Sequence, residues 1–243
     1  MTFCLSLPRR FLVVLALLTG LSAAGAAIAD HHEGASTAEQ APTPLIMRYR
    51  EGEHYQRVPI AKPSRGDDIE VVEYFSYGCV HCFNFDPVVE TWAAEPKPGV
   101  KFTRTPAVFN RSWEFLAQAF YAAEVLGVSE ELHQPLFRAI HTDNINIGNP
   151  ALMTKLFTDH SAVSADDFAQ AFDSFSVRSK VQQSKAQGRS LRLRAVPSMV
   201  VGGQYVVDGS MLKGGNEEML EVVDYLVGLL KSERTMLEAA AGD

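Results

Sequence analysis

Hydrophobic positions along this chain follow two patterns, short β-branched runs and longer stretches with helical spacing. Residues 69–75 (IEVVEYF) are bounded by turn-forming residues on both sides, which predicts a strand near the centre of a sheet. After this run, apolar residues recur three and four positions apart, at Cys82, Phe85, Val89 and Trp92. The pattern therefore predicts a strand, a tight turn and a helix, with Cys79 and Cys82 at the start of the helix.

The rest of the chain alternates in a similar way. Residues 100–105 predict a second strand, and residues 113–187 carry helical spacing, with helix starts at Asn149-Pro150 and Ser164 and an end at Gly188. Strands are predicted again at residues 198–202 and 204–207, and a last helix begins near Asn216. This order predicts an α/β domain, residues 45–110 and 189–232, interrupted by an all-helical insertion domain, residues 111–188.

The first 29 residues have the pattern of a secretory signal peptide. Two arginines precede an apolar run and small residues that end at Ala29, which predicts cleavage before Asp30. A membrane anchor is the alternative, but residues 19–27 are rich in glycine, alanine and serine and do not extend the apolar run to spanning length. We expect residues 30–44 to form a flexible linker and residues 233–243 a disordered tail.

Composition narrows the class of protein. The 243 residues include 22 Lys and Arg against 29 Asp and Glu, a net charge of −7, and 47% are hydrophobic. This is a soluble globular composition, and its acidity argues against nucleic acid binding, which needs a basic surface. Cys4 lies in the predicted signal peptide, so the exported chain keeps only Cys79 and Cys82 in an oxidising compartment. We expect a monomer with redox chemistry and no metal or other cofactor.

The run Cys79-Val80-His81-Cys82 places two thiols close enough to alternate between dithiol and disulfide. Unpaired N–H groups and the dipole at a helix N-terminus stabilise a thiolate, so Cys79 is expected to be an exposed nucleophile. Cys82 lies on the apolar stripe and is expected to be the buried resolving thiol. His81 adds a donor, or a positive charge, beside the Cys79 sulfur. A stabilised thiolate favours the reduced protein and makes its disulfide a strong oxidant.

Three other interpretations of the cysteine pair have less support. Half of a zinc site would need two more ligands at finger-like spacing, and the sequence has no second cysteine pair. Covalent haem needs histidine directly after the second cysteine, where this chain has Phe83. A purely structural disulfide is the third interpretation, although so small a loop removes little chain entropy.

Two positions outside the cysteine motif also favour a redox site. Glu73 shares a strand face with three apolar residues, and a carboxylate there is expected mainly at functional sites. Burial near the thiols would raise its pKa and let it relay protons, whereas a Glu73 at a strand end would reach water. Val196-Pro197 opens a strand, where proline removes a ladder donor. We expect a cis bond there, although trans is the commoner form.

Together these features resemble the DsbA family of periplasmic thiol:disulfide interchange proteins, in the thioredoxin superfamily. The resemblance rests on the strand with Glu73, the C-V-H-C motif, the helical insertion and the downstream Val-Pro pair. Further stretches that resemble the family are residues 49–55 (YREGEHY), 73–76 (EYFS), 123–128 (AEVLGV), 135–137 (PLF), 172–175 (FDSF) and 196–205 (VPSMVVGGQY). They extend over nearly the whole exported chain.

The resemblance implies a thioredoxin-like fold with an inserted all-helical domain. It also implies a redox-active disulfide, Cys79–Cys82, that is donated to newly exported, reduced and unfolded proteins. Cys79 resembles the attacking cysteine, Cys82 the resolving one, His81 the histidine that stabilises the thiolate, and Glu73 the buried acid. Pro87 stands where the superfamily places a helix-kinking proline.

The family also implies a substrate groove and a membrane partner. Pro197 resembles the cis-proline beside the groove, which would include Val196 and Val80, and the quinone-linked membrane protein DsbB would reoxidise the pair. The chain departs from the best-known members at Val80, where they carry proline, and this dipeptide tunes the redox potential.

We therefore expect a periplasmic dithiol oxidase. One alternative is an isomerase or reductant, although the sequence shows no N-terminal dimerisation domain of the kind an isomerase would use. The other is a periplasmic binding or folding module whose disulfide never turns over.

Overall fold

The computed structural model describes residues 48–58 and 66–241. The predicted signal peptide, residues 1–29, and the predicted linker, residues 30–44, lie outside the described residues. The separation of the remainder into an α/β domain and an insertion domain stays a prediction. Among the described residues, no helix combines the length and the apolar character needed to cross a bilayer.

Five strands form one mixed sheet in the order β1-β5-β4-β2-β3. Their bounds are β1 Gln56–Arg57, β2 Ile69–Phe75, β3 Val100–Pro106, β4 Ser198–Val201 and β5 Tyr205–Asp208. β2 runs parallel to β3 and antiparallel to β4, so the predicted apolar strand is confirmed with a neighbour on each side. In this register Glu73 lies opposite Arg104 of β3 and Met199 of β4.

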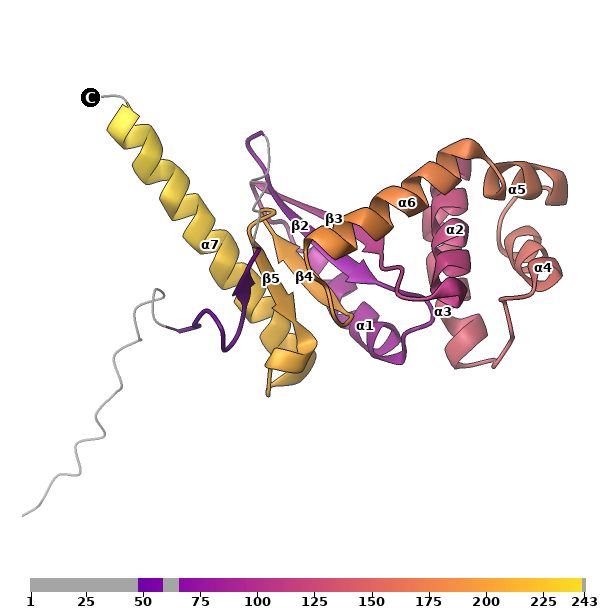
Figure 1. Ribbon diagram of the computed structural model, residues 1–243, viewed down its shortest axis with the longest axis horizontal. Coiled ribbons are helices and arrows are strands. Elements are labelled where there is room, and N and C mark those ends of the chain that lie inside the picture. The colour runs from indigo at the N-terminus through magenta and orange to yellow at the C-terminus, as the bar shows by residue number, and fades with distance from the viewer. Residues whose placement is uncertain (1–47, 59–65, 242–243) are drawn as a thin grey trace, which may run out of the picture. The chain divides into compact units, whose positions relative to one another are not determined.

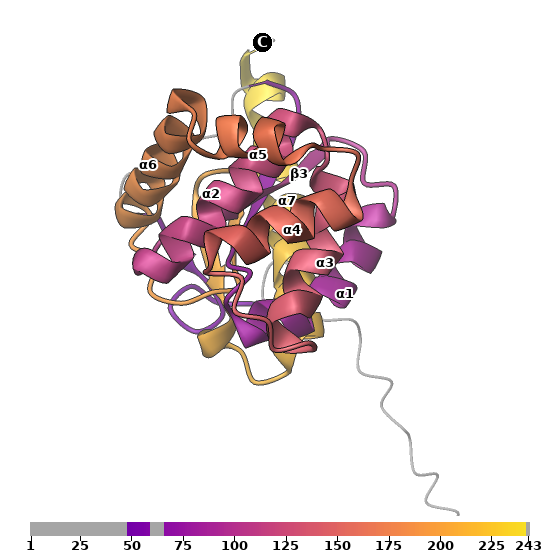
Figure 2. The same ribbon diagram turned by 90° about the vertical axis from the view of Figure 1, so that its right-hand side faces the viewer.

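Five helices follow β3 before the chain returns to the sheet, and Figure 2 shows them from their own side. They are α2 Arg111–Leu126, α3 Ser129–His141, α4 Pro150–His160, α5 Ala165–Phe172 and α6 Phe175–Ser190. The predicted caps are confirmed, since Asn149 and Ser164 accept hydrogen bonds from backbone N–H groups at the starts of α4 and α5. Gly188 does not end α6, because the Leu191 and Leu193 N–H groups bond to carbonyls of the final turn and carry the helix to Ser190.

Helices cover both faces of the sheet. α1 (Val80–Ala94) and α7 (Gly215–Ala241) pack on the face that carries Ile69 and Val71. Val72 and Tyr74 point the other way and join a cluster formed mainly by the helical insertion. Figure 1 shows α7 on one side of the sheet and α2 to α6 on the other. Glu73 alternates with Val72 and Tyr74, so it lies on the face that α1 covers.

The predicted disordered tail is wrong up to Ala241, because α7 continues through that residue. Met236 and Leu237 are largely exposed there, so packing does not hold this part of the helix. Alanine, leucine, methionine and glutamate have high helix propensity, which lets a helix already anchored on the sheet propagate outward.

Candidate active site

The candidate site begins in the turn that joins β2 to α1. The Cys79 N–H donates to the Ser76 carbonyl over 3.0 Å, and the Gly78 N–H donates to Ser76 Oγ over 3.2 Å. A Cβ on Gly78 would lie 2.9 Å from Trp113 Nε1 of α2, so the turn needs glycine at its point of close approach. The turn places Cys79 at the N-cap of α1.

Cys79 is the capping residue of the helix through its sulfur. Its Sγ accepts a hydrogen bond from the Cys82 N–H over 3.3 Å, as an oxygen of serine or aspartate does at other helix starts. Both cysteines are free thiols, and Cys82 is completely buried. The expected exposure of Cys79 is wrong, because it is only 8% exposed and its Sγ lies 3.5 Å from the Val196 carbonyl oxygen. The neighbouring Val80 is the exposed residue of the motif.

The two thiols have different electrostatic surroundings. The pKa of Cys79 is lowered to about 6, mainly by a hydrogen bond from the Cys82 thiol and also by the backbone N–H groups of Cys82 and His81, against the opposing effect of burial. Burial raises the pKa of Cys82, and the hydrogen bond and the negative charge of Cys79 raise it more. The site therefore concentrates ionisation on the first sulfur and keeps the second protonated.

His81 acts on Cys79 from an exposed position in the first turn of α1. Its backbone N–H and the charge of its ring both lower the pKa of Cys79. The structure thus brings His81, Cys79 and Cys82 together at one helix end.

The Val196-Pro197 peptide bond is cis, in agreement with the sequence expectation. It immediately precedes β4, whose Ser198 pairs with Tyr74 of β2. Continuing this antiparallel register places Pro197 beside Phe75 and Val196 beside the turn. The contact between the Val196 carbonyl and Cys79 Sγ follows from this register.

Glu73 is buried within the sheet, so the alternative in which it reaches water at a strand end is wrong. Arg104 is its cross-strand neighbour and donates from Nε to Glu73 Oε2 over 2.9 Å. Desolvation nevertheless dominates and raises the pKa of Glu73 to about 7, because the Arg104 charge offsets it only in part and Asp86 opposes ionisation as well.

Sequence reasoning missed a buried charged network beside Glu73. Arg104 Nη2 lies 2.9 Å from Glu90 Oε1 and 3.5 Å from Asp86 Oδ1, and Asp86 also binds His133 Nε2 over 2.7 Å. Asp86 is 2% exposed on the apolar stripe of α1, and a polar residue on such a stripe is a signal by which the sequence could have revealed it. Arg104 and His133 could not be found without the strand register and the packing of α3 on α1.

Part of this network has the donor types of a metal site. Asp86, Glu90 and His133 offer ligand atoms within 4.8 Å of one another. The Arg104 guanidinium already contacts both carboxylates, and its fixed positive charge would repel a divalent cation. The set is therefore better explained as an ion-pair network.

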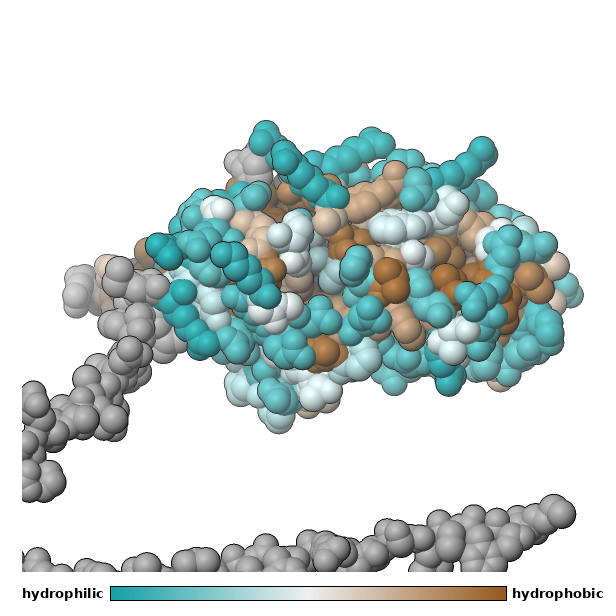
Figure 3. Space-filling model, turned by 90° about the horizontal axis from the view of Figure 1, so that it is seen from below, coloured by the Kyte–Doolittle hydropathy of each residue, from teal (hydrophilic) through white to brown (hydrophobic). Residues whose placement is uncertain are grey.

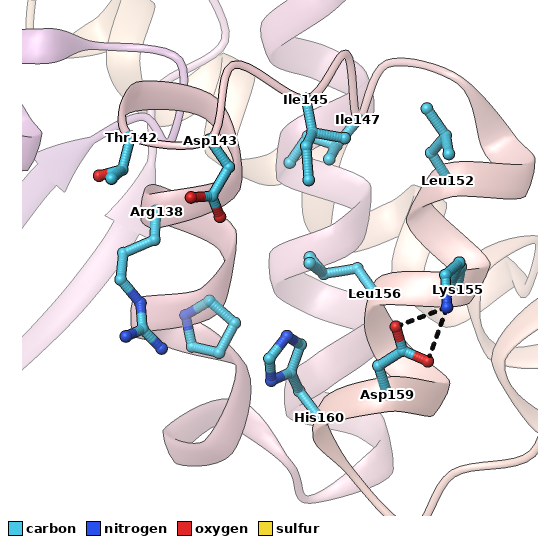
Figure 4. Close-up of a pocket in the computed structure, with 11 residues that line it drawn as sticks. Arg138, Thr142, Asp143, Ile145, Ile147, Leu152, Lys155, Leu156, Asp159 and His160 are labelled. Atoms are coloured by element: carbon cyan, nitrogen blue, oxygen red, sulfur yellow. Dashed lines mark hydrogen bonds and ion pairs between the residues drawn. The ribbon is translucent and has the colours of Figure 1, made fainter.

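The described residues also line cavities. One of about 390 Å³ lies between α3 and α4, with Ile145, Ile147 and Leu152 facing it beside the Lys155–Asp159 ion pair (Figure 4). None of the predicted site residues lines it. A second, of about 730 Å³, borders the charged network and is lined in part by Tyr77, Arg104 and His133.

Comparison with known proteins agrees with this geometry. Residues 99–218 match the family described as DSBA-like thioredoxin domain. The chain is 39% identical over 171 residues to the thiol:disulfide interchange protein DsbA of Azotobacter vinelandii, covering 70% of this chain and 77% of that one. Its identity to DsbA of Pseudomonas syringae pv. tomato is 35% over 202 residues, 83% of this chain and 90% of that one.

Solved structures give the same result. The crystal structure of Pseudomonas aeruginosa DsbA superposes with a TM-score of 0.72 at 31% identity, over 77% of this chain and 97% of that one. The oxidoreductase DsbA from Xylella fastidiosa gives a TM-score of 0.70 at 33% identity, over 76% and 98%. Both share the thioredoxin-like fold, and the helical insertion seen here is consistent with DsbA. The chain therefore belongs to the DsbA-like family of thioredoxin-fold thiol:disulfide oxidoreductases.

Proposed function

We propose that this protein is a periplasmic dithiol oxidase that passes a Cys79–Cys82 disulfide to reduced, newly exported proteins. The main support is the opposite displacement of the two thiol pKa values, that of Cys79 down to about 6 and that of Cys82 upward. A protein that stabilises its own thiolate stabilises its reduced state, so its disulfide oxidises other thiols more strongly. The exchange uses the protein's own cysteines and needs no cofactor.

The proposed reaction consists of two exchanges. A substrate thiolate attacks the Cys79 sulfur, a substrate–Cys79 disulfide forms, and Cys82 leaves as a thiolate that takes up a proton. A second substrate thiolate then attacks the substrate's own sulfur, and Cys79 leaves as the thiolate. Two electrons pass from the substrate to the cysteine pair. The lowered pKa of Cys79 makes it a good leaving group in the second exchange, and His81 contributes to that pKa.

We assign the proton that Cys82 needs to Glu73. The Glu73 carboxyl is buried with a pKa raised to about 7, so both of its forms are populated near neutral pH. Its charge also raises the pKa of Cys82, so the two groups are electrostatically coupled. A protonated Glu73 can supply the proton as Cys82 leaves, and an ionised Glu73 can accept it when the disulfide forms again.

The proposed substrate groove surrounds the Cys79 sulfur. Val80 is 51% exposed on one side, and Val196-Pro197 lies on the other, with the Val196 carbonyl 3.5 Å from the sulfur. Phe109 is also exposed and stacks on Trp113, the residue packed against Gly78. Unfolded chains expose apolar side chains, which can pack against exposed apolar residues such as Val80 and Phe109. The surface in Figure 3 is mostly hydrophilic, with hydrophobic residues gathered in patches.

We further propose that the protein acts as a monomer and that a quinone-linked membrane oxidase of the DsbB type restores its disulfide. The support is membership of the DsbA-like family and the secretory pattern of residues 1–29. An isomerase or reductant would have a less stabilised Cys79 thiolate, and a binding module would hold its disulfide without exchange.

Expression in a bacterium that lacks its own periplasmic dithiol oxidase tests this function. The unaltered chain should restore disulfides in exported proteins, and Cys79→Ser should not. Cys82→Ser should accumulate mixed disulfides, because the Cys79 thiolate can still attack a disulfide of an exported protein, displacing one of its thiolates, and Cys82 is no longer there to break the mixed disulfide. Thiol alkylation followed by non-reducing electrophoresis of the periplasmic fraction measures all three.

The same strain tests the partner and the alternatives. Deleting its membrane oxidase should leave the unaltered chain reduced. A Cys82→Ser protein that turned over normally would contradict the two assigned cysteine roles. If the cysteine pair of the purified protein kept one oxidation state in all redox buffers, a binding module would be the better interpretation.

The pKa of Cys79 makes a second prediction, about stability. Its folded value of about 6 lies below the unfolded value of about 8.5, so its ionisation stabilises the reduced protein fully above pH 8.5. This contribution falls as the pH drops from 8.5 to 6 and is absent below 6. The free energy of unfolding of the reduced protein minus that of the oxidised protein should therefore rise by on the order of 2 kcal/mol across this window.

Denaturant unfolding of both forms at several pH values measures this difference. Glu73 titrates in both forms, so its contribution largely cancels, and neither sulfur titrates in the oxidised protein. Cys82 acts with the opposite sign only above about pH 8.5, since its pKa is raised. A difference that stayed constant between pH 6 and 8.5 would show that Cys79 is not activated.

Glu73→Gln tests the proton relay. Glutamine keeps the shape and can accept from Arg104, but it cannot donate an acidic proton. Substrate oxidation, corrected for the ionised fraction of substrate thiol, should slow by about tenfold or more below pH 7 and lose its inflection near pH 7. Glu70→Gln is the matched control, because Glu70 lies on the same strand with its side chain exposed. Identical pH–rate profiles for Glu73→Gln and the unaltered protein would remove Glu73 from the mechanism.

A further inference from the structure

Tyr77, in the turn before Cys79, is held at two atoms by one helix of the insertion. Its side chain is buried, with the hydroxyl oxygen 3.1 Å from His133 Nδ1 and the backbone carbonyl oxygen 2.7 Å from His141 Nε2. Phe137 lies between the two histidines in sequence, and its ring packs edge-on against the Tyr77 ring at 4.9 Å. Positions 133, 137 and 141 are four apart, so they follow one face of α3. We call these three residues the Tyr77 clamp.

The partners of each histidine identify one donor nitrogen on its ring. A carboxylate accepts, so His133 Nε2 donates to Asp86 Oδ1 over 2.7 Å. Its Nδ1 faces the Tyr77 hydroxyl, which can either donate to this nitrogen or accept from it. A carbonyl also only accepts, so His141 donates to Tyr77 from Nε2.

The bond from His141 fixes one peptide unit of the turn. The Tyr77 carbonyl and the Gly78 N–H belong to the same peptide plane, and that N–H donates to Ser76 Oγ over 3.2 Å. This plane lies in the middle of the turn that the Cys79 N–H closes on the Ser76 carbonyl. It is therefore held on both edges, by α3 and by Ser76, and rotation of the plane would break both hydrogen bonds.

The clamp also reaches the first turn of α1. The His141 ring stacks on Phe83, the residue after Cys82, with ring centroids 5.1 Å apart and an angle of 21° between the planes. His133 reaches Asp86 one turn later. α3 therefore contacts the chain both before and after the cysteine pair, at the turn and at the helix that the turn caps.

We propose that His141 and His133 are positioning residues for thiol exchange, which hold Tyr77 so that the Cys79 sulfur meets the N–H groups of α1. This inference rests on the proposed role of Cys79 as the sulfur that a substrate thiolate attacks. Neither histidine touches that sulfur in the contacts described, so both act through the turn. The helical insertion then has a part in the chemistry besides covering the sheet.

Titration of the Cys79 thiolate by its ultraviolet absorbance in the reduced protein tests the proposal. His141→Leu removes the donor to Tyr77 and should raise the pKa of Cys79 by about 0.5 to 1 unit, a threefold to tenfold loss of thiolate at acidic pH. His141→Gln carries an amide N–H at the place of Nε2 and should restore most of the thiolate. Tyr77→Phe removes only the bond to His133 and should give a smaller rise.

Two controls separate positioning from general damage. His160→Leu alters an exposed histidine of α4 that lines the cavity in Figure 4 and should leave the titration unchanged. Thermal unfolding of each oxidised variant reports stability without the thiolate.

Three results would overturn the clamp. The first is an unchanged Cys79 pKa in both His141→Leu and Tyr77→Phe. The second is a rise in the Cys79 pKa that is proportional to the loss of thermal stability in every variant. The third is a Cys79 pKa in His141→Gln that is as high as that in His141→Leu. If the unaltered protein itself lacked a lowered Cys79 pKa, the clamp and the proposed function would both fail.

Discussion

The chemistry of this protein depends on a sulfur that occupies the capping position of a helix. Cys79 Sγ accepts the Cys82 N–H and faces the positive end of the α1 dipole, so negative charge is favoured there. Cys82, one turn further on, is fully buried and resists ionisation. The same short motif therefore creates a stabilised thiolate and a protonated partner. The asymmetry arises from position in the helix, since the two side chains are chemically identical.

The sheet places a buried carboxyl group, that of Glu73, on the face that α1 covers. Burying Glu73 costs free energy that its ion pair with Arg104 only partly offsets, which is why its pKa rises instead of falling. The parallel register of β2 and β3 sets the two side chains opposite each other, and Arg104 extends the pairing to Asp86 on α1. A structure that needed only stability would gain from apolar residues here. The position of Glu73, Arg104 and Asp86 in the core is consistent with a site where proton transfer, rather than stability, governs the choice of residue.

Local patterns were sufficient for much of the fold and for the thiols. The strand over residues 69–75, the helix that begins after Cys79 and the unusual acid at Glu73 each leave a signal within about ten residues of sequence. The Tyr77 clamp and Arg104 leave none, because they depend on which strands and helices meet across the fold. The burial of Cys79 was missed for the same reason, since Val196 reaches it from more than a hundred residues away. The helical end of α7 leaves no packing signal in the sequence, because Met236 and Leu237 are exposed and only helix propensity extends the predicted helix that precedes them.

The proposed oxidase activity requires that the fold stabilise the reduced cysteine pair through Cys79. The most direct measurement is the equilibrium between the Cys79–Cys82 dithiol and disulfide in graded glutathione buffers at neutral pH. The account predicts a reduction potential clearly less negative than about −200 mV, on the oxidising side of the common dithiol proteins. A potential near about −270 mV, where reducing thioredoxins lie, would contradict it.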